Sequence, residues 1–145
     1  MVSFFNELDL QGAEVLDLGC GQGRDALMIA RLGHKVTGVD ISKTGVSQMV
    51  EQAEVEGLEV KGVVSDIVTY SPNTMYDVVL LDRVLHMLET DEVRGSLLSK
   101  VRRCTRVNGY IMIADTPSNM KFIRGFFEDQ AEWIPDLNRG NFFVY

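Results

Sequence analysis

The chain has 145 residues, enough for one compact domain spanning residues 1–145 and too few for two. Hydrophobic residues make up 46% and charged residues 24%, as in ordinary globular proteins, and no apolar stretch reaches the roughly 18 residues of a membrane helix. The formal net charge of −7 disfavours a broad phosphate-binding surface, so we expect neither a membrane nor a nucleic-acid partner.

Residues 1–11 have no basic region before an apolar run, so we expect no secretory signal and a cytoplasmic location. The two cysteines, Cys20 and Cys104, cannot build a disulfide framework, and we expect both to be reduced. No Cys/His cluster has the spacing of metal ligands, so we expect no metal site.

Short apolar runs rich in β-branched residues recur along the chain. They are continuous rather than alternating, which is typical of strands covered on both faces. The expected strands are residues 15–18, 36–39, 60–64, 78–81 and 111–114.

Amphipathic helices are expected between these runs. One follows Ser42 as its N-cap, and its apolar face comprises Val46, Met49, Val50 and Ala53. Another follows Thr90, and its apolar face comprises Val93, Leu97, Val101 and Cys104. That helix ends in a basic cluster before Asn108-Gly109, namely Lys100, Arg102, Arg103 and Arg106. We interpret this cluster as a helix end that complements its dipole, in preference to a nucleic-acid patch.

The alternation of strands and helices predicts βαβ units, a mainly parallel sheet and helices on both faces, hence a three-layer α/β fold. Met120, Ile123 and Phe127 indicate a last helix. Residues 132–134 and 142–145 flank a stretch rich in turn residues, 135–140, and are expected to pair as a short closing hairpin.

The strongest functional signal is the glycine loop 18–23, Leu-Gly-Cys-Gly-Gln-Gly, placed between the first strand and the first helix. Glycines let the backbone turn sharply and approach a ligand, which then meets backbone N–H groups at a helix N-terminus. The next strand ends in Asp40, about twenty residues further on, where a carboxylate can accept hydrogen bonds from ribose hydroxyls. A purely structural tight turn would not need this acid.

A nicotinamide dinucleotide site is the main alternative for this loop. Its fingerprint, G-x-G-x-x-G/A, needs a small third residue for close packing between helix and strand. Counted from Gly19, that position holds Arg24, and the third glycine comes one residue earlier, at Gly23.

Residues 15–25 resemble motif I of class I, Rossmann-like, S-adenosylmethionine-dependent methyltransferases. Residues 36–42, 64–67 and 76–86 resemble the three motifs that follow, so the resemblance covers most of residues 15–115. The entry into the helix, Arg24-Asp25-Ala26-Leu27, is similar to the small-molecule branch that includes tellurite-resistance-type methyltransferases.

The resemblance implies S-adenosylmethionine as cofactor and assigns roles to residues at strand ends. Asp17 would hold the ammonium group, and the loop backbone at Gly19, Cys20, Gly21 and Gly23 would approach the methionine part. Asp40 would bind the ribose. Ile41 and Ile67 would pack on the two sides of the adenine, and Asp66 would accept from its amino group. The backbone at Leu81 and Asp82 would line the methyl-donor end.

The resemblance also implies a helical lid before the first strand, and here only about a dozen residues precede that strand. We therefore expect a reduced or absent lid, and a homodimer or partner chain covering that region and the C-terminal edge. Three functions stay open: a small-molecule methyltransferase, a non-catalytic cofactor-binding module that needs a partner, and a nicotinamide oxidoreductase.

No convincing general base is visible in the sequence. His86 is a weak candidate, and we favour a packing or cofactor-wall role for it, as we favour a structural role for His34 and Cys20. Arg83, Asp115 and Thr116 are candidates for the substrate rim by position alone. The stretch 81–84, Leu-Asp-Arg-Val, lacks the Asn/Asp-Pro-Pro-aromatic pattern of enzymes that methylate nucleobase amino groups, so a small-molecule acceptor is expected.

Overall fold

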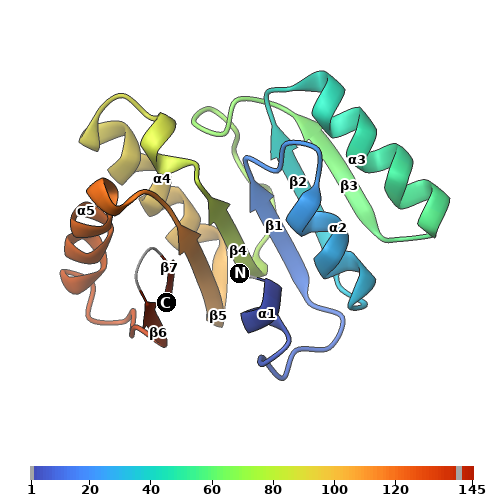
Figure 1. Cartoon of the computed structure of the whole chain (residues 1–145). Helices are drawn as coiled ribbons and strands as arrows, with labels where there is room; N and C mark the ends of the chain where they lie inside the picture. The colour runs from blue at the N-terminus through green and yellow to red at the C-terminus, as the bar shows by residue number, and fades with distance from the viewer. Residues whose placement is uncertain (1, 140–141) are drawn as a thin grey trace.

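The computed structural model describes residues 2–139 and 142–145. Its strands are β1 (Glu14–Leu18), β2 (Lys35–Asp40), β3 (Val60–Val64), β4 (Tyr76–Asp82), β5 (Thr105–Ala114), β6 (Leu137–Arg139) and β7 (Phe142–Val144). Within these residues they form one sheet in the order β3-β2-β1-β4-β5-β7-β6 (Figure 1). Strands β1 to β5 pair in parallel, whereas β7 runs antiparallel to β5 and to β6.

Helices cover both faces of the sheet, which confirms the predicted three-layer α/β fold. They are α1 (Val2–Phe5), α2 (Arg24–Arg31), α3 (Lys43–Glu56), α4 (Asp91–Cys104) and α5 (Pro117–Glu128), with a short 3₁₀ turn η1 (Leu85–Met87). Helices α4 and α5 lie on one side, and α2 and α3 lie on the other (Figure 1). None of the helices in the described part of the chain is long and apolar enough to span a membrane.

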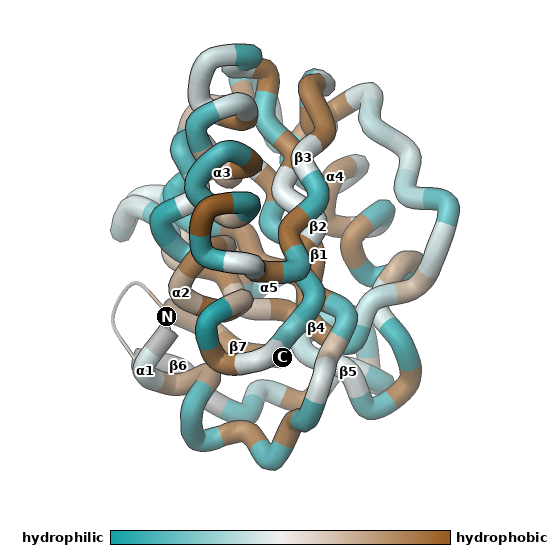
Figure 2. The backbone as a smooth tube through the Cα atoms, turned by 90° about the vertical axis from the view of Figure 1, so that its right-hand side faces the viewer, coloured by the Kyte–Doolittle hydropathy of each residue, from teal (hydrophilic) through white to brown (hydrophobic). Residues whose placement is uncertain are grey.

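Two apolar layers hold the sheet between the helices. Successive side chains of a strand point to opposite faces, so Leu16 and Leu18 pack towards α4 and α5, whereas Val15 packs towards α2 and α3. Hydrophobic and hydrophilic stretches succeed each other along α3 (Figure 2), as expected for a helix with one buried face. The predicted caps are confirmed, because Ser42 Oγ accepts from Gly45 N at 3.1 Å and Thr90 Oγ1 accepts from Val93 N at 3.2 Å.

Three of the four residues in the basic cluster make polar contacts within the molecule, namely Lys100, Arg102 and Arg106. The sequence prediction that Arg106 belongs to the end of the helix is wrong. Helix α4 ends at Cys104, and Arg106 lies in β5, where its Nη1 donates to Asp77 at 2.8 Å. The strand begins early because Thr105 pairs with Tyr76 and the irregular stretch around Asn108 then joins it to the buried part. Lys100 donates to the carbonyls of Ile67 and Val68 at 3.1 and 2.5 Å.

The closing hairpin exists, but its first strand does not lie at residues 132–134. It is β6, inside the stretch expected to be the loop. Trp133 packs instead against the core, with its ring 6.1 Å from that of Phe127, and a hydrogen bond from Asp136 N to Val144 O starts the pairing after Pro135. Residues 140 and 141, also assigned to the hairpin by the sequence, lie outside the described residues.

Replacing Leu97 with alanine tests the layer under α4. This side chain is 1% exposed in the cluster shared by α4, α5 and the sheet, so Leu97→Ala should lower the free energy of unfolding by about 2–5 kcal/mol. Val55→Ala on α3, where the side chain is 83% exposed, should change it by less than about 0.5 kcal/mol. Urea unfolding followed by circular dichroism measures both, and equal effects would contradict this description of the core.

Candidate cofactor site

The functional residues predicted from the sequence gather at the carboxyl edge of the sheet. Strand β1 pairs with β2 on one side and β4 on the other, so the direction in which the chain winds reverses beside it. Open parallel sheets bind ligands in the crevice at such a switch point. Asp17, Asp40 and Asp82 all lie in the last two positions of these three strands.

The three glycines of the loop have positive φ angles, but only one of them faces open space. A Cβ on Gly19 would lie 2.6 Å from Val84 Cγ2, and one on Gly23 would lie 2.2 Å from Met49 Cγ. A Cβ on Gly21 would meet nothing within 4 Å. Gly19 and Gly23 therefore permit close packing, whereas Gly21 presents backbone to the crevice.

The same geometry decides against the dinucleotide fingerprint. Its third small residue is needed for close packing, and here that role falls to Gly23, which meets Met49 of α3. The Arg24 side chain is 65% exposed and takes no part in the packing. The structure therefore gives no support to a nicotinamide dinucleotide fingerprint in this loop.

Asp40 ties the glycine loop to the end of β2. Its Oδ2 accepts a hydrogen bond from Gly21 N at 2.9 Å, and its Oδ1 accepts one from Ser42 N at 2.8 Å. The carboxylate is only half-buried, so a ligand can reach it. Its proximity to Gly21 places an acceptor beside the exposed backbone of the loop.

Asp17 is buried directly before this loop, on the side of the sheet that faces α2. Burial, with smaller contributions from Asp25, Asp82 and Asp40, raises the pKa of its carboxyl from 3.8 to about 7, although Arg24 opposes the shift. Among the described residues no group donates a hydrogen bond to this carboxyl. Its oxygens still reach solvent, because no side-chain oxygen of the described residues is both fully buried and without a partner. A largely buried acid that meets the crevice without a protein donor is suited to a cationic ligand.

Cys20 does not have the properties of a nucleophile. Its side chain is buried against Gly38, and burial, with Asp17 and Asp40 nearby, raises the pKa of the thiol to about 12. The thiol therefore stays protonated near neutral pH, which confirms the structural interpretation. Only the backbone of Cys20 can face a ligand in the loop.

Asp82 lies at the end of β4 in a group that the sequence did not connect. Arg24 Nη2 lies 2.6 Å from Asp82 Oδ2 and 3.3 Å from Asp25 Oδ2, and Arg83 Nε lies 3.6 Å from Asp82 Oδ1. Burial, together with Asp25, raises the pKa of Asp82. Arg24 and Asp82 are 58 positions apart in the sequence. Their proximity could be expected because Arg24 follows β1 and the glycine loop, and Asp82 ends β4 at the same edge of the sheet.

The residues expected around an adenine lie beyond β2 and β3. Ile41 is 72% exposed, Ile67 is half-buried against the core, and Asp66 is exposed. Asp66 Oδ1 accepts from Val68 N at 2.9 Å and so shapes the turn after β3. Their contacts with a ligand stay a prediction.

The stretch after β4 differs from expectation at Asp115. It does not support a packing role for His86, and the alternative expected role, on the cofactor wall, stays a prediction. The side chain of His86 is 37% exposed, with Nδ1 3.6 Å from Asp115 Oδ1, so packing in this turn is supplied instead by Val84 and Leu85. Asp115 is fully buried, so it is not a rim residue. Its Oδ2 accepts from Leu85 N at 2.9 Å and its Oδ1 from Asn119 Nδ2 at 2.9 Å, which fixes the turn to the end of β5.

His34 is structural, as expected. Its Nδ1 accepts from Ala13 N at 3.0 Å, its ring packs edge-on against Phe5 at 4.8 Å, and burial lowers its pKa. These contacts lie at the amino edge of the sheet, where α1 also packs. The described residues before β1 therefore do not cover the carboxyl edge.

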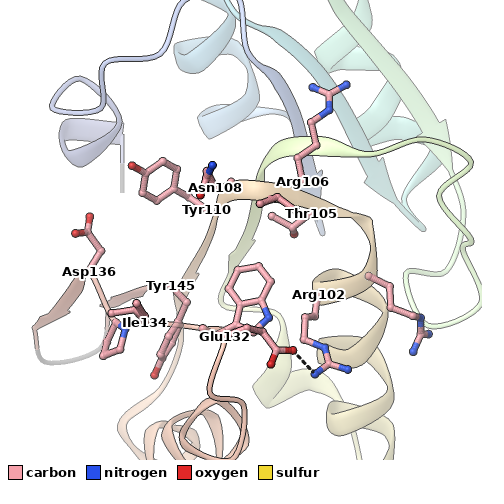
Figure 3. Close-up of a pocket in the computed structure, with 14 residues that line it drawn as sticks. Arg102, Thr105, Arg106, Asn108, Tyr110, Glu132, Ile134, Asp136 and Tyr145 are labelled. Carbon is pink, nitrogen blue, oxygen red and sulfur yellow. Dashed lines mark hydrogen bonds and ion pairs between the residues drawn. The ribbon is translucent and has the colours of Figure 1, made fainter.

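A hollow of about 650 Å³ lies at that amino edge and holds none of the predicted site residues (Figure 3). Its walls come from the start of β5 and from residues 132–136, with Tyr110, Trp133 and Tyr145 among them. The Arg106 side chain points away from the hollow (Figure 3) towards Asp77, and Arg102 pairs with Glu132 at 3.4 Å. The candidate site therefore stays at the carboxyl edge, where the predicted residues lie.

Comparison with solved structures gives the class of this fold. The crystal structure of TehB from Haemophilus influenzae superposes with a TM-score of 0.83 at 22% identity, over 99% of this chain and 60% of that chain. A TehB-like S-adenosylmethionine-dependent methyltransferase from Corynebacterium glutamicum gives 0.77 at 20% identity, over 99% and 83%. The fold is that of class I, Rossmann-like methyltransferase domains.

The family follows from the sequence comparison. The family described as Tellurite resistance protein TehB matches residues 8–129, and the chain belongs to it. The protein named "Probable S-adenosyl-L-methionine-dependent methyltransferase TehB" of Haemophilus influenzae is 31% identical over 125 residues, 82% of this chain and 43% of that protein. The Ubiquinone biosynthesis O-methyltransferase of Rickettsia canadensis is 30% identical, over 88% of this chain and 54% of that protein.

The chain thus spans about half the length of the curated relatives it matches. The resemblance seen in motif I and in the stretch after Arg24 is confirmed at the level of the family. The comparisons give no support to a nicotinamide oxidoreductase or to a non-catalytic module.

The different surroundings of the loop glycines predict different effects of one added methyl group. Gly23→Ala combines a positive φ with overlap on Met49 and should lower the free energy of unfolding by about 2–4 kcal/mol. Gly21→Ala has the same backbone cost but no overlap, and should lower it by about 1–2 kcal/mol. Thermal and urea unfolding compare them, and a larger loss for Gly21→Ala would contradict the assignment of Gly21 to the open crevice.

Proposed function

We propose that this chain binds S-adenosylmethionine at the carboxyl edge of the sheet and transfers its methyl group to a small-molecule acceptor. The observation that carries the proposal is the buried carboxyl of Asp17, without a hydrogen-bond donor among the described residues, beside the open backbone of Gly21 and the acceptor Asp40. The names of the curated relatives support the same cofactor and reaction.

The residues present fit both the amino-acid part and the nucleoside part of this cofactor. Asp17 offers a carboxylate to the ammonium group. Most N–H groups of residues 19–23 are already bonded within the protein, so the first N–H groups of α2, after Gly23, would face the carboxylate of the ligand. Asp40 offers an acceptor to the ribose hydroxyls. Ile41, Asp66 and Ile67 would surround the adenine, and Leu81 and Asp82 would line the donor end.

The cofactor supplies a methyl group already activated by a positively charged sulfur. The chain therefore has mainly to orient the acceptor and exclude water at the donor end, which is proximity catalysis. In this proposal the turn 84–88, which Asp115 fixes to the end of β5, would form a wall of that end. His86 is exposed there and is the candidate base for an acceptor that must lose a proton.

Further parts of the proposal concern the setting of the protein. We propose a cytoplasmic protein whose residues 1–145 form one cofactor-binding domain, with no nucleic-acid substrate, in line with the net charge of −7. We also propose that a second copy or a partner chain covers the region of the short lid and the C-terminal edge. Sedimentation of the purified chain with and without S-adenosylhomocysteine measures self-association.

Calorimetric titration with S-adenosylhomocysteine and with NAD tests the cofactor. We expect S-adenosylhomocysteine to bind and NAD not to bind. Asp40→Ala should weaken binding by about 1.5–3 kcal/mol, because hydrogen bonds to a charged acceptor are lost. Glu59→Ala, at the opposite edge, is the control and should bind normally. A folded protein that binds neither ligand would refute the proposed function.

The raised pKa of Asp17 predicts that cofactor binding depends on pH. An ammonium group favours the ionised carboxyl, so below a pKa of about 7 binding must first remove a proton. Affinity for S-adenosylhomocysteine should fall about tenfold between pH 8 and pH 6, as one linked proton requires. Asp17→Asn should weaken binding and flatten this profile, and a profile that persists in the variant would assign it to another group.

The same variant should be more stable than the natural chain when no ligand is present. Because the folded pKa lies above the ordinary value of 3.8, folding takes up a proton between about pH 4 and pH 7 and the ionised group opposes folding above that range. The midpoint of thermal unfolding of Asp17→Asn at pH 8 should therefore rise by a few degrees. The gain should disappear at pH 4.

A further inference from the structure

Arg24 is a cation placed among carboxyl groups at the proposed donor end. Its guanidinium contacts Asp82 at 2.6 Å and Asp25 at 3.3 Å, and its charge also acts on the buried Asp17. The side chains of Asp25 and Asp82 are only 13% and 18% exposed, so their mutual repulsion is weakly screened by water. Without a ligand, Arg24 supplies positive charge that these acids need.

The proposed cofactor and its product differ by one charge at this end. S-adenosylmethionine carries a sulfonium cation, and S-adenosylhomocysteine carries a neutral thioether, whereas their ammonium, carboxylate, ribose and adenine groups are the same. A sulfonium placed beside Asp82 competes with the guanidinium for the same carboxylate. A thioether does not compete.

We propose that Arg24 determines the preference of this site between the cationic cofactor and the neutral product, by pairing with Asp82. This inference rests on the proposed function. Arg24 begins α2 and is 65% exposed, so its side chain can leave Asp82 for solvent when a cation arrives. Separating Arg24 from Asp82 has a free-energy cost. Only binding of the cationic ligand requires this separation, so Arg24 weakens binding of the cofactor more than binding of the product.

The pair also has a consequence for the reaction. The cost of separating Arg24 from Asp82 exists while the sulfonium is bound and vanishes when the sulfur becomes neutral, because the pair can then form again. An interaction that is unfavourable only before the reaction lowers the barrier, because the transition state has already lost part of the charge. Arg24 acts here as a positioning residue for charge and makes no bond to the acceptor.

A different role for Arg24 would give a different pattern of affinities. If its guanidinium held the carboxylate of the ligand's amino-acid part, it would contribute equally to both ligands, because both carry that group. The ratio of the two affinities therefore separates competition at Asp82 from direct attachment. This ratio is also insensitive to errors in the concentration of active protein.

Calorimetry with both ligands on Arg24→Gln, Arg24→Lys and the natural chain tests the proposal. The ratio of the dissociation constant of the product to that of the cofactor should rise about threefold to tenfold in Arg24→Gln, the effect of one partly exposed charge. Arg24→Lys keeps the charge and should keep the ratio within about twofold. Arg31→Gln is the matched control, since Arg31 pairs with Glu56 at the other end of α2.

Thermal unfolding without ligand is the second measurement. Arg24→Gln should be slightly less stable than the natural chain, because Asp25 and Asp82 lose their shared cation. An unchanged ratio in a folded Arg24→Gln, or an equal loss of affinity for both ligands, would overturn the inference. Failure of the natural chain to bind either ligand would instead refute the proposed function.

Discussion

The parallel pairing of β1 with both β2 and β4 is the constraint on which the site depends. Leu18 lies opposite Val39 on one side and Leu81 on the other, so the three strands end almost level. The acidic residues at the ends of these strands, which are far apart in the chain, are thereby brought to one edge of the sheet. The glycine loop can lie across this edge because Gly19 and Gly23 have no Cβ, which would otherwise overlap Val84 and Met49.

This arrangement places a carboxyl group inside an otherwise apolar strand, where packing alone would favour an apolar side chain. Asp17 occupies a position whose neighbours on the same strand are fully buried apolar residues, and its raised pKa shows that ionisation there opposes folding. The apolar layers on both faces of the sheet supply the stability that this residue removes. Under the proposed function, a cationic ligand bound at Asp17 would recover this cost.

Much of this could be predicted from the sequence because the signals are local. Strand interiors, helix caps and the glycine loop each depend on residues within a few positions, and Ser42, Thr90 and the loop were all identified in this way. The pairing of Arg24 with Asp82 and the burial of Asp115 depend on which strand ends meet, which no short pattern encodes. The predicted first strand of the hairpin was wrong because Trp133 packs against the core beside Phe127, Ile134 is exposed, and the strand begins only at Leu137.

The two edges of the sheet differ in how well their polar groups are satisfied, and this difference is a better guide to function than the size of a hollow. At the amino edge Asp77 accepts from both Glu14 N and Arg106; burial raises its pKa, but these bonds outweigh burial and the pKa is lowered. His34 is likewise bonded to Ala13. At the carboxyl edge Asp17 has no such donor among the described residues. Polar groups that the protein satisfies by itself stabilise a fold, whereas a largely buried acid without a protein donor, whose oxygens still reach solvent, is placed to receive a ligand.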